Sequence, residues 1–130
     1  MKLKHLAPYL PYSVKCSYDC LDIYGQNWER YKGTLWLHTF KELQVGSIKN
    51  LQLHLRPLSD LTKEIEHNGE RFVPVQKLKQ GDIINLELID MRDLIAAPKE
   101  LPFIVIEKLF EWHFDVFNGI GDWALNMNEV

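Results

Sequence analysis

The sequence has little of several features that mark specialised proteins. It holds two cysteines in 130 residues, too few for the disulfide framework of a small secreted domain, and proline and glycine are too scarce for a disordered or collagen-like chain. Charge of neither sign dominates, since 15 lysines and arginines stand against 18 aspartates and glutamates. A chain with a net charge of -3 has no global attraction for nucleic acid, although a local basic patch is compatible with that total.

A long hydrophobic run is also missing. The most apolar window, Leu101 to Phe117, is interrupted by five ionisable residues, too many for a membrane span of about 20 residues: Glu107, Lys108, Glu111, His113 and Asp115. Pro8 and Pro11 break up the N-terminus, so no apolar stretch of signal-peptide type forms. The sequence therefore predicts a cytoplasmic protein that makes no contact with a membrane.

The two cysteines lie in a segment that alternates apolar and polar residues, from Ser13 to Ile23. This pattern predicts a strand, in which Cys16 and Cys20 are roughly 13 Å apart, beyond the reach of a disulfide. Free thiols fit a reducing cytoplasm. A helix over the same residues would bring the two sulfur atoms within bridging range, so the inference depends on the strand.

With 46% hydrophobic and 25% charged residues, the composition is that of one soluble domain spanning residues 1–130. Apolar and β-branched residues predict four further strands, at Arg30 to His38, Ile48 to Leu55, Asp82 to Ile89 and Trp123 to Met127. The linker from Thr39 to Gly46 is short, so the second and third strands are expected to pair antiparallel.

The segment from Leu61 to Phe72 has two readings. Ile65 to His67 and Glu70 to Phe72 flank Asn68 and Gly69, which is the spacing of a two-residue β-hairpin. Alternatively, Ser59 and Asp60 cap a short helix that Asn68 and Gly69 end. The hairpin is favoured, and the helix stays open.

Pro102 is suited to the first position of a main helix that runs to Asn118, with Gly119 as its stop. Its charged residues fall on one narrow arc, so the helix is expected to be mostly buried and its carboxylates solvated. Asp90 caps a further short helix, Met91 to Ala97. The predicted fold class is α+β: an antiparallel sheet of about five strands with one main C-terminal helix on one face and one or two short helices.

Two residues are weak candidates for catalysis. His113 projects into the apolar arc of the predicted helix, where a histidine bonded to a backbone carbonyl is favoured over a ligand or a general base. Cys20 and a distant histidine could form a nucleophile and base pair, although a strand cysteine is more often a small core residue. An enzyme is therefore the less favoured reading.

Neither a metal nor a cofactor is expected. The five histidines lack the spacing that places two metal ligands on one helix face or strand edge. Gly119 and Gly121 follow a helix, whereas a phosphate-binding loop joins a strand to the start of a helix.

One segment interleaves aromatic and basic residues: Trp28, Arg30, Tyr31, Lys32 and Trp36. Such residues anchor protein interfaces, and they also stack bases and contact phosphates on nucleic-acid-binding sheets. Protein binding is favoured, because the surrounding charge is not basic.

Three strings carry a resemblance: HLAPYLPY near the start, RPLSDLTKEIEHNGERFVP from Arg56 to Pro74, and LPFIVIEKLFEWHFDVF from Leu101 to Phe117. Together they resemble small uncharacterised proteins of prophages and other mobile elements of gut-type bacteria. The resemblance implies a bacterial cytoplasm and a phage-related context, and it brings no functional residue. The expected function is that of a small non-catalytic protein that binds a protein partner or self-assembles. Nucleic-acid binding and a small enzyme with a site near His113 and Cys20 are the alternatives.

Overall fold

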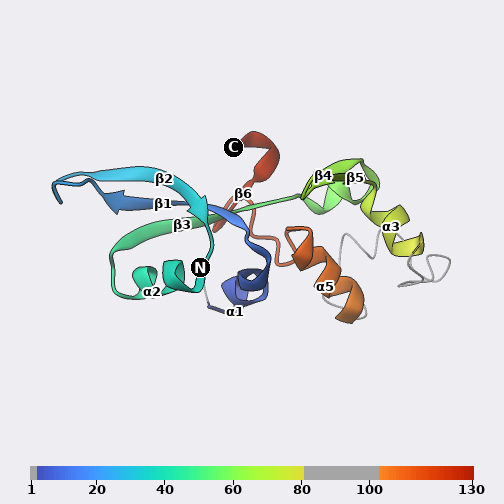
Figure 1. Ribbon diagram of the computed structural model, residues 1–130, viewed down its shortest axis with the longest axis horizontal. Coiled ribbons are helices and arrows are strands. Elements are labelled where there is room, and N and C mark those ends of the chain that lie inside the picture. The colour runs from blue at the N-terminus through green and yellow to red at the C-terminus, as the bar shows by residue number, and fades with distance from the viewer. Residues whose placement is uncertain (1–2, 81–102) are drawn as a thin grey trace.

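The structure of the protein is a computed structural model, which describes residues 3–80 and 103–130 (Figure 1). It is α+β, as the sequence predicts. The helices are α1 (Leu3–Leu6), α2 (Leu37–Gln44), α3 (Pro74–Gln80) and α5 (Phe103–Glu111), with short 3₁₀ helices η1 (Ala7–Tyr12), η2 (Leu58–Thr62) and η4 (Met127–Glu129). The strands are β1 (Lys15–Leu21), β2 (Trp28–Thr34), β3 (Ile48–Leu55), β4 (Ile65–His67), β5 (Glu70–Phe72) and β6 (Ala124–Asn126).

Four strands form a mixed sheet in the order β2-β1-β3-β6. β1 is antiparallel to both β2 and β3, whereas β6 is parallel to β3. In the part of the chain that the structure describes, this corrects the expected antiparallel sheet of about five strands. The strand predicted at Ile48 to Leu55 is confirmed with the same bounds, and those predicted at Ser13 to Ile23 and Trp123 to Met127 are confirmed with shorter ones. The strand expected at Asp82 to Ile89 and the helix at Met91 to Ala97 lie outside the described residues.

The predicted strand from Arg30 to His38 is wrong beyond Thr34, and so is its pairing with β3. Trp36 and Leu37 instead begin α2, where they are 57% and 74% exposed. The Thr39 hydroxyl accepts a bond from the Trp36 N–H at 3.2 Å and fixes the first turn of the helix. Because α2 fills the linker, β3 pairs with β1 and not with β2.

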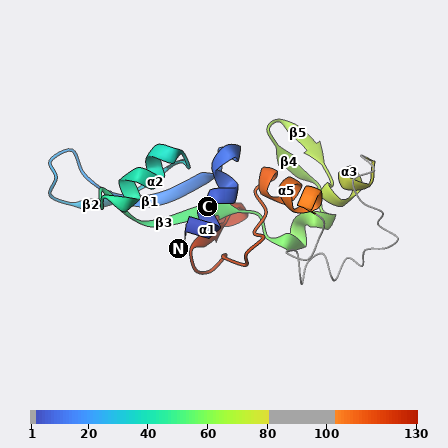
Figure 2. The same ribbon diagram turned by 90° about the horizontal axis from the view of Figure 1, so that it is seen from below.

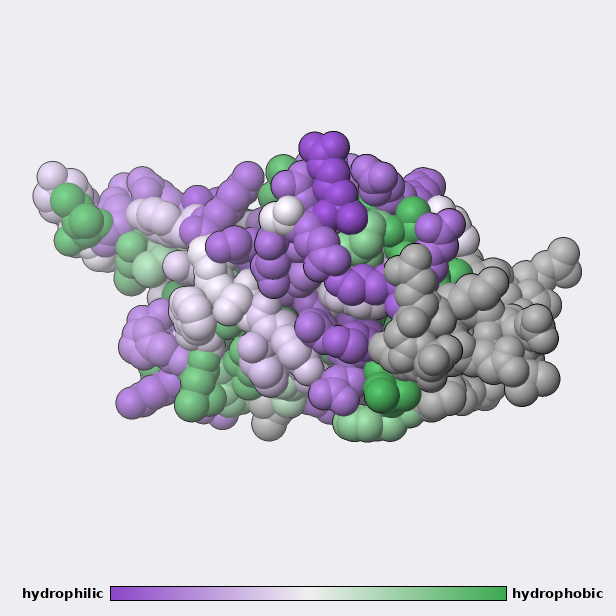
Figure 3. Space-filling model, turned by 45° about the vertical axis from the view of Figure 1, so that its right-hand side comes forward, coloured by the Kyte–Doolittle hydropathy of each residue, from purple (hydrophilic) through white to green (hydrophobic). Residues whose placement is uncertain are grey.

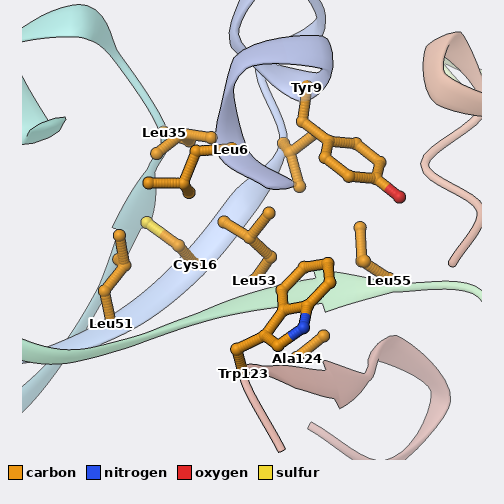
Figure 4. Packing of buried hydrophobic residues seen from close by; sticks show 10 residues of the cluster. Leu6, Tyr9, Cys16, Leu35, Leu51, Leu53, Leu55, Trp123 and Ala124 are labelled. Carbon is orange, nitrogen blue, oxygen red and sulfur yellow. The ribbon is translucent and has the colours of Figure 1, made fainter. Parts of the chain in front are cut away.

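The main core lies on one face of the sheet, beneath α1, η1 and α2 (Figure 4). Leu51, Leu53 and Leu55 of β3 point into it together, as their alternation predicts. Cys16 of β1 is fully buried beside them, and both cysteines are free thiols. The sheet therefore has one apolar face and one face that carries the polar residues of the same strands.

A second apolar cluster occupies the other end of the molecule, where η2, α3, α5 and the β4–β5 hairpin meet (Figures 1 and 2). The favoured hairpin is confirmed, since His67 pairs with Glu70 across Asn68 and Gly69, whose φ angles are 51° and 81°. Both angles are those that a two-residue hairpin turn requires. The alternative helix, capped by Ser59 and Asp60 and ended by Asn68 and Gly69, is wrong: the 3₁₀ helix η2 ends at Thr62, and Ile65 to His67 form a strand.

The main helix is shorter than predicted, because α5 ends at Glu111 rather than Asn118. His113 has a φ of 64°, which ends the helix, and the chain that follows runs beside the end of β3. There the Arg56 N–H donates to the His113 carbonyl, and the Asp115 N–H donates to the Arg56 carbonyl. The start expected at Pro102 lies outside the described residues.

Two further expectations for this segment are corrected. Asp115 is not on a solvated stripe: it is 4% exposed, and its carboxylate accepts bonds from the Gly119 and Ile120 N–H groups at 2.7 and 3.0 Å. Gly119 is not a helix stop, because α5 ends at Glu111; instead, a Cβ at Gly119 would overlap the Trp123 indole. The glycine thus permits close packing of the loop against the tryptophan.

Tyr9 joins the two ends of the molecule. It belongs to the main core and is fully buried, and its ring meets Phe110 of α5 edge-on at 5.0 Å between centroids. Its hydroxyl donates to the Phe114 carbonyl at 2.6 Å and accepts from the Val116 N–H at 3.2 Å. Burial raises the pKa of the Tyr9 hydroxyl, so the group stays a neutral donor.

Candidate functional site

The face of the sheet opposite the main core, called here the polar face, is crossed by a hydrogen-bond network. Arg30 of β2 donates to Asp19 of β1 at 3.2 Å, and to the Asn50 carbonyl and the Gln52 side chain of β3 at 2.6 Å each. The Gln52 amide in turn donates to the Asp122 carbonyl just before β6. The network therefore fixes the guanidinium of Arg30 flat against the sheet.

Asp19 is held as a carboxylate within this network. Its other oxygen accepts a bond from the Asn50 amide at 2.7 Å. That bond, followed by the bond and charge of Arg30, lowers the pKa of the Asp19 carboxyl. The carboxylate of Asp19 is thus paired with a cation of the same face.

Next to this network lies a hollow of about 260 Å³ lined by Lys15, Lys32, Gly33, Thr34 and His54. The Lys15 ammonium donates to the Thr34 hydroxyl at 3.1 Å. Lys15 and Lys32 have no ion-pair partner within the described residues. The hollow is therefore a concentration of positive charge beside β2.

Ser17 and His54 meet on the floor of the polar face, with 2.7 Å between Oγ and Nε2. Both are buried, at 3% and 7% exposure. Burial, then the charges of Lys32 and Arg30, lowers the pKa of His54, so its imidazole is neutral. No carboxylate among the described residues bonds the other ring nitrogen, so the pair lacks the third group that orients a catalytic base.

β2 is the edge strand beside this face, and its backbone pairing defines which groups point outward. The Asp22 N–H donates to the Asn27 carbonyl, and the Leu35 N–H donates to the Val14 carbonyl. Hydrogen-bonded positions alternate in an antiparallel pair, so the groups of Glu29, Tyr31 and Gly33 face β1. Trp28, Arg30, Lys32 and Thr34 therefore direct their N–H and C=O groups away from the sheet.

The five predicted interaction residues do not share one face. Trp28, Arg30 and Lys32 alternate along β2 on the polar face, where the Lys49 ammonium lies 3.9 Å from the centre of a Trp28 ring. Tyr31 is on the opposite face and stacks on Tyr18 at 6.4 Å. Trp36 caps α2. The five residues that are close together in the sequence thus lie on three different surfaces of the molecule.

The β1–β2 hairpin ends in an exposed apolar tip that projects from the molecule, with apolar atoms at its end (Figure 3). Ile23 and Tyr24 at the tip are 91% and 77% exposed. Asp22 holds this turn by accepting bonds from the Tyr24 and Gln26 N–H groups. The tip extends the exposed edge of β2.

His113 lies in a second hollow, at the junction of the two ends of the molecule. It is 8% exposed, and its Nε2 donates to the Tyr12 carbonyl at 2.8 Å, which is the backbone bond expected of a core histidine. The His67 ring stands perpendicular to it at 4.7 Å. Burial, opposed by the Tyr12 bond and reinforced by His67, Arg56 and Lys15, lowers the pKa of His113 to about 4.

Cys20 does not lie near His113. It pairs with Ile48 at the far end of β3, whereas His113 bonds Arg56 just beyond the near end. Eight residues of strand separate the two positions, about 26 Å at the rise of an extended chain. The sequence-based site that combined them is therefore not assembled. Cys16 is not a candidate nucleophile either. Burial raises the pKa of its thiol to about 11, so the reactive thiolate does not form near neutral pH.

Sequence reasoning missed Ser17, His54, Arg56 and His67. The alternation along Ile48 to Leu55 predicts that Asn50, Gln52 and His54 share the face of β3 opposite Leu51, Leu53 and Leu55. The partner of His54, however, depends on the β1–β3 register, which the sequence does not display. Likewise, His67 meets His113 only because the β4–β5 hairpin folds onto the end of α5. The alternation of apolar and polar residues around Ser17, which places it on the polar side of its strand, is the one feature of the sequence that points to it.

Within residues 3–80 and 103–130, no three histidine, cysteine or acidic side chains are arranged to hold a metal ion. None of the helices in those residues is long and apolar enough to cross a membrane. No protein-family model, curated protein or solved structure matches the chain.

Proposed function

We propose that the protein binds a protein partner, which adds an extended acidic strand to the edge of β2. The observation that carries the proposal is the row of outward backbone groups at Trp28, Arg30, Lys32 and Thr34, which coincides with the basic side chains of the polar face. Strand addition takes its affinity from backbone bonds and its selectivity from the alternate side chains. Both are present along the same four residues.

A second copy of β2 is a poor occupant of this edge. Outward-facing residues of the two copies would have to pair with one another. In each antiparallel register centred on a residue from Arg30 to Lys32, one of these cations faces a cation of the other copy. Like charges directly opposite one another destabilise a strand pair, so self-association in these central registers is disfavoured.

An acidic strand satisfies the same geometry. Glutamates at alternate positions would face Arg30 and Lys32, and Lys15 lies in the hollow beside them. Lys32 has no carboxylate partner among the residues the structure describes, so its pairing with an added strand breaks no existing ion pair. Charge complementarity of this kind also speeds association.

Single-stranded nucleic acid is supported less well. Base stacking needs open aromatic faces beside the cations. Lys49 covers one side of Trp28, and Tyr31 lies on the other face of the sheet against Tyr18. The polar face therefore offers cations without a row of open rings.

The test uses a short peptide with glutamate at alternate positions and valine or threonine between them, followed by NMR of the backbone amides. We expect saturable shifts and slower hydrogen exchange at Arg30, Lys32 and Thr34, since those N–H groups become hydrogen-bonded. Lys32→Pro removes one outward N–H and leaves the bonds to β1 intact, so it should abolish binding. Lys32→Ala keeps the N–H and should weaken binding by roughly tenfold or less.

Three comparisons make the result decisive. The same peptide with lysine for glutamate, and one with N-methylated backbone at the pairing positions, should both fail to bind. Equal binding of the lysine peptide, or retained binding by Lys32→Pro, contradicts strand addition. Tighter saturable binding of an oligonucleotide at the same amides would overturn the proposal in favour of nucleic acid.

A further inference from the structure

The hollow that contains His113, called here the junction pocket, is built from segments far apart in the sequence. It has a volume of about 450 Å³, within the range of small-ligand sites. The end of η1, the start of β1, the residue after β3, the β4–β5 hairpin and the end of α5 all contribute to its lining. Both ends of the molecule thus meet around it.

Backbone strain is concentrated at this pocket. Of the five described non-glycine residues with positive φ, three line it: Ser13 at 53°, Asn68 at 51° and His113 at 64°. Left-handed conformations of such residues cost free energy and collect at functional sites, where the surrounding structure holds them. At Ser13 and His113 the walls of the pocket are therefore held in conformations that the chain does not favour on its own, whereas the φ of Asn68 is the one that its hairpin turn requires.

Arg56 is the most unusual member of the lining. It is 8% exposed, yet its guanidinium bonds only neutral groups: Nε donates to the Trp112 carbonyl at 3.0 Å, and one Nη donates to the Glu66 carbonyl at 2.8 Å. No carboxylate lies within 4.0 Å of it among the described residues. Burial lowers the pKa of Arg56, and the charge of Asp60 opposes this shift without a direct bond. Buried charges in proteins are normally paired directly, so this cation lacks a bonded counterpart.

Arg56 also has unused donors. A guanidinium carries five N–H groups in a fixed plane. The bonds to Trp112 and Glu66 use two of them, which leaves three for a ligand in the pocket. A fork of parallel N–H groups fits the two oxygens of a carboxylate or phosphate group.

The remaining charges of the lining reinforce this conclusion. Its two carboxylates already have cationic partners, since Glu66 pairs with Arg71 at 3.7 Å and Glu111 with Lys108 at 2.9 Å. Its second cation, Lys15, bonds only the Thr34 hydroxyl. The acidic side chains of the pocket are therefore compensated, whereas its basic ones are not.

We infer that the junction pocket binds a small molecule through an oxyanion group, carboxylate or phosphate, that pairs with Arg56 and Lys15. The Arg56 fork supplies the directed bonds and Lys15, at the more exposed side, supplies a second positive charge. His67 and His113, neutral near pH 7, form a wall next to the anion. Lys15 also lines the hollow beside β2, but Arg56 lies only in the junction pocket, so the shifts expected at Arg56, His67 and His113 test this inference apart from strand addition.

The experiment is an NMR titration of the histidine rings and backbone amides with inorganic phosphate and, separately, with acetate, sodium chloride holding the ionic strength constant. We expect one of the two anions to bind saturably, with shifts concentrated at Tyr12, Arg56, His67 and His113. Tighter binding of phosphate identifies a phosphate group as the recognised chemistry, and tighter binding of acetate a carboxylate. No saturable shift with either anion overturns the inference.

Matched variants distinguish the pocket from general surface charge. Lys15→Ala removes one exposed cation of the lining and should weaken binding about three- to tenfold. Lys41→Ala removes a cation from the exposed side of α2 and should leave the affinity unchanged. Arg56→Lys keeps the charge without the fork and should weaken binding by at least about tenfold. Equal effects of Lys15→Ala and Lys41→Ala would contradict the site, even if Arg56→Lys failed to fold.

Discussion

Asp22 at the hairpin tip and Asp115 at the junction perform the same local task in opposite surroundings. Each carboxylate accepts two backbone N–H bonds and thereby shapes a loop, Asp22 from Tyr24 and Gln26, and Asp115 from Gly119 and Ile120. The first loop projects into solvent, whereas Asp115 is 4% exposed. The two loops have the same kind of hydrogen bond and differ in burial, so comparing them isolates the effect of burial on stability.

The comparison extends to the networks nearby. On the polar face, Arg30 pairs with Asp19 where water reaches both groups. At the junction, Tyr9 and Asp115 bond backbone groups that water does not reach. Removing a buried partner leaves its donors unsatisfied, whereas water replaces an exposed one. The free energy of unfolding should therefore depend strongly on the side-chain bonds at the junction and very little on those of the β1–β2 hairpin.

The largest effect is expected from Asp115→Ala. The buried N–H of Gly119 and the part-buried N–H of Ile120 lose a charged acceptor, each bond worth about 1.5 to 3 kcal/mol, so the free energy of unfolding should fall by about 4 kcal/mol. Urea unfolding followed by circular dichroism measures the change. Asp22→Ala is the matched control and should lower stability far less. Equal losses in the two variants would show that burial does not determine how much these bonds contribute to the free energy of unfolding.

A slightly smaller effect is expected from acid. The pKa of His113 is about 4 in the folded protein and near 6.5 when unfolded, so between these values the unfolded chain binds a proton that the folded one does not. The stability that depends on the neutral ring is complete above pH 6.5, falls as the pH is lowered toward 4, and is constant below. One such group contributes roughly 3 kcal/mol.

The measurement is urea unfolding at several pH values for the protein and for His113→Asn. Asparagine tolerates the positive φ at this position and does not titrate. The variant should therefore lose much of the acid sensitivity, and His67, whose pKa burial also lowers, should account for part of what remains. His38→Asn, on the exposed side of α2, should retain the full pH dependence. An unchanged slope in His113→Asn would contradict a neutral buried ring.

Tyr9→Phe should have an intermediate effect. The substitution keeps the ring against Phe110 and removes the hydroxyl that bonds Phe114 and Val116. The Phe114 carbonyl and the Val116 N–H then keep only their 3.0 Å bond to each other. We expect a loss of about 2 kcal/mol in the free energy of unfolding. Tyr24→Phe, at the exposed tip, is the control and should have no effect. A loss of similar size there would remove the distinction between the two ends of the molecule.

The sequence predicts well what depends on neighbouring residues. The β4–β5 hairpin follows from Asn68 and Gly69, because both must adopt positive φ. The alternation of Leu51, Leu53 and Leu55 defines the buried face of β3. These features need no knowledge of distant contacts, which is why they are correct.

The rest depends on contacts between segments far apart. His113 ends α5 only because the following chain pairs with Arg56, 57 positions earlier by residue number. Trp36 and Leu37 are apolar enough to resemble a strand, yet α2 leaves them exposed. For the same reason, two features appear only in the folded chain: the pairing of Ser17 with His54, and an Arg56 without a directly bonded carboxylate among the described residues.

The smallest effect is expected on the polar face, where Asp19→Asn tests the other side of the comparison. The asparagine keeps the shape of the side chain on β1 and removes the charge that faces Arg30. Exposed ion pairs gain little, because water and salt compete with them. We expect the thermal midpoint to stay unchanged within the error of measurement, at low salt and at high salt. A loss as large as that of Tyr9→Phe would mean that the Arg30 network stabilises the sheet, and strand addition at β2 would then have to draw on side chains that the fold already needs.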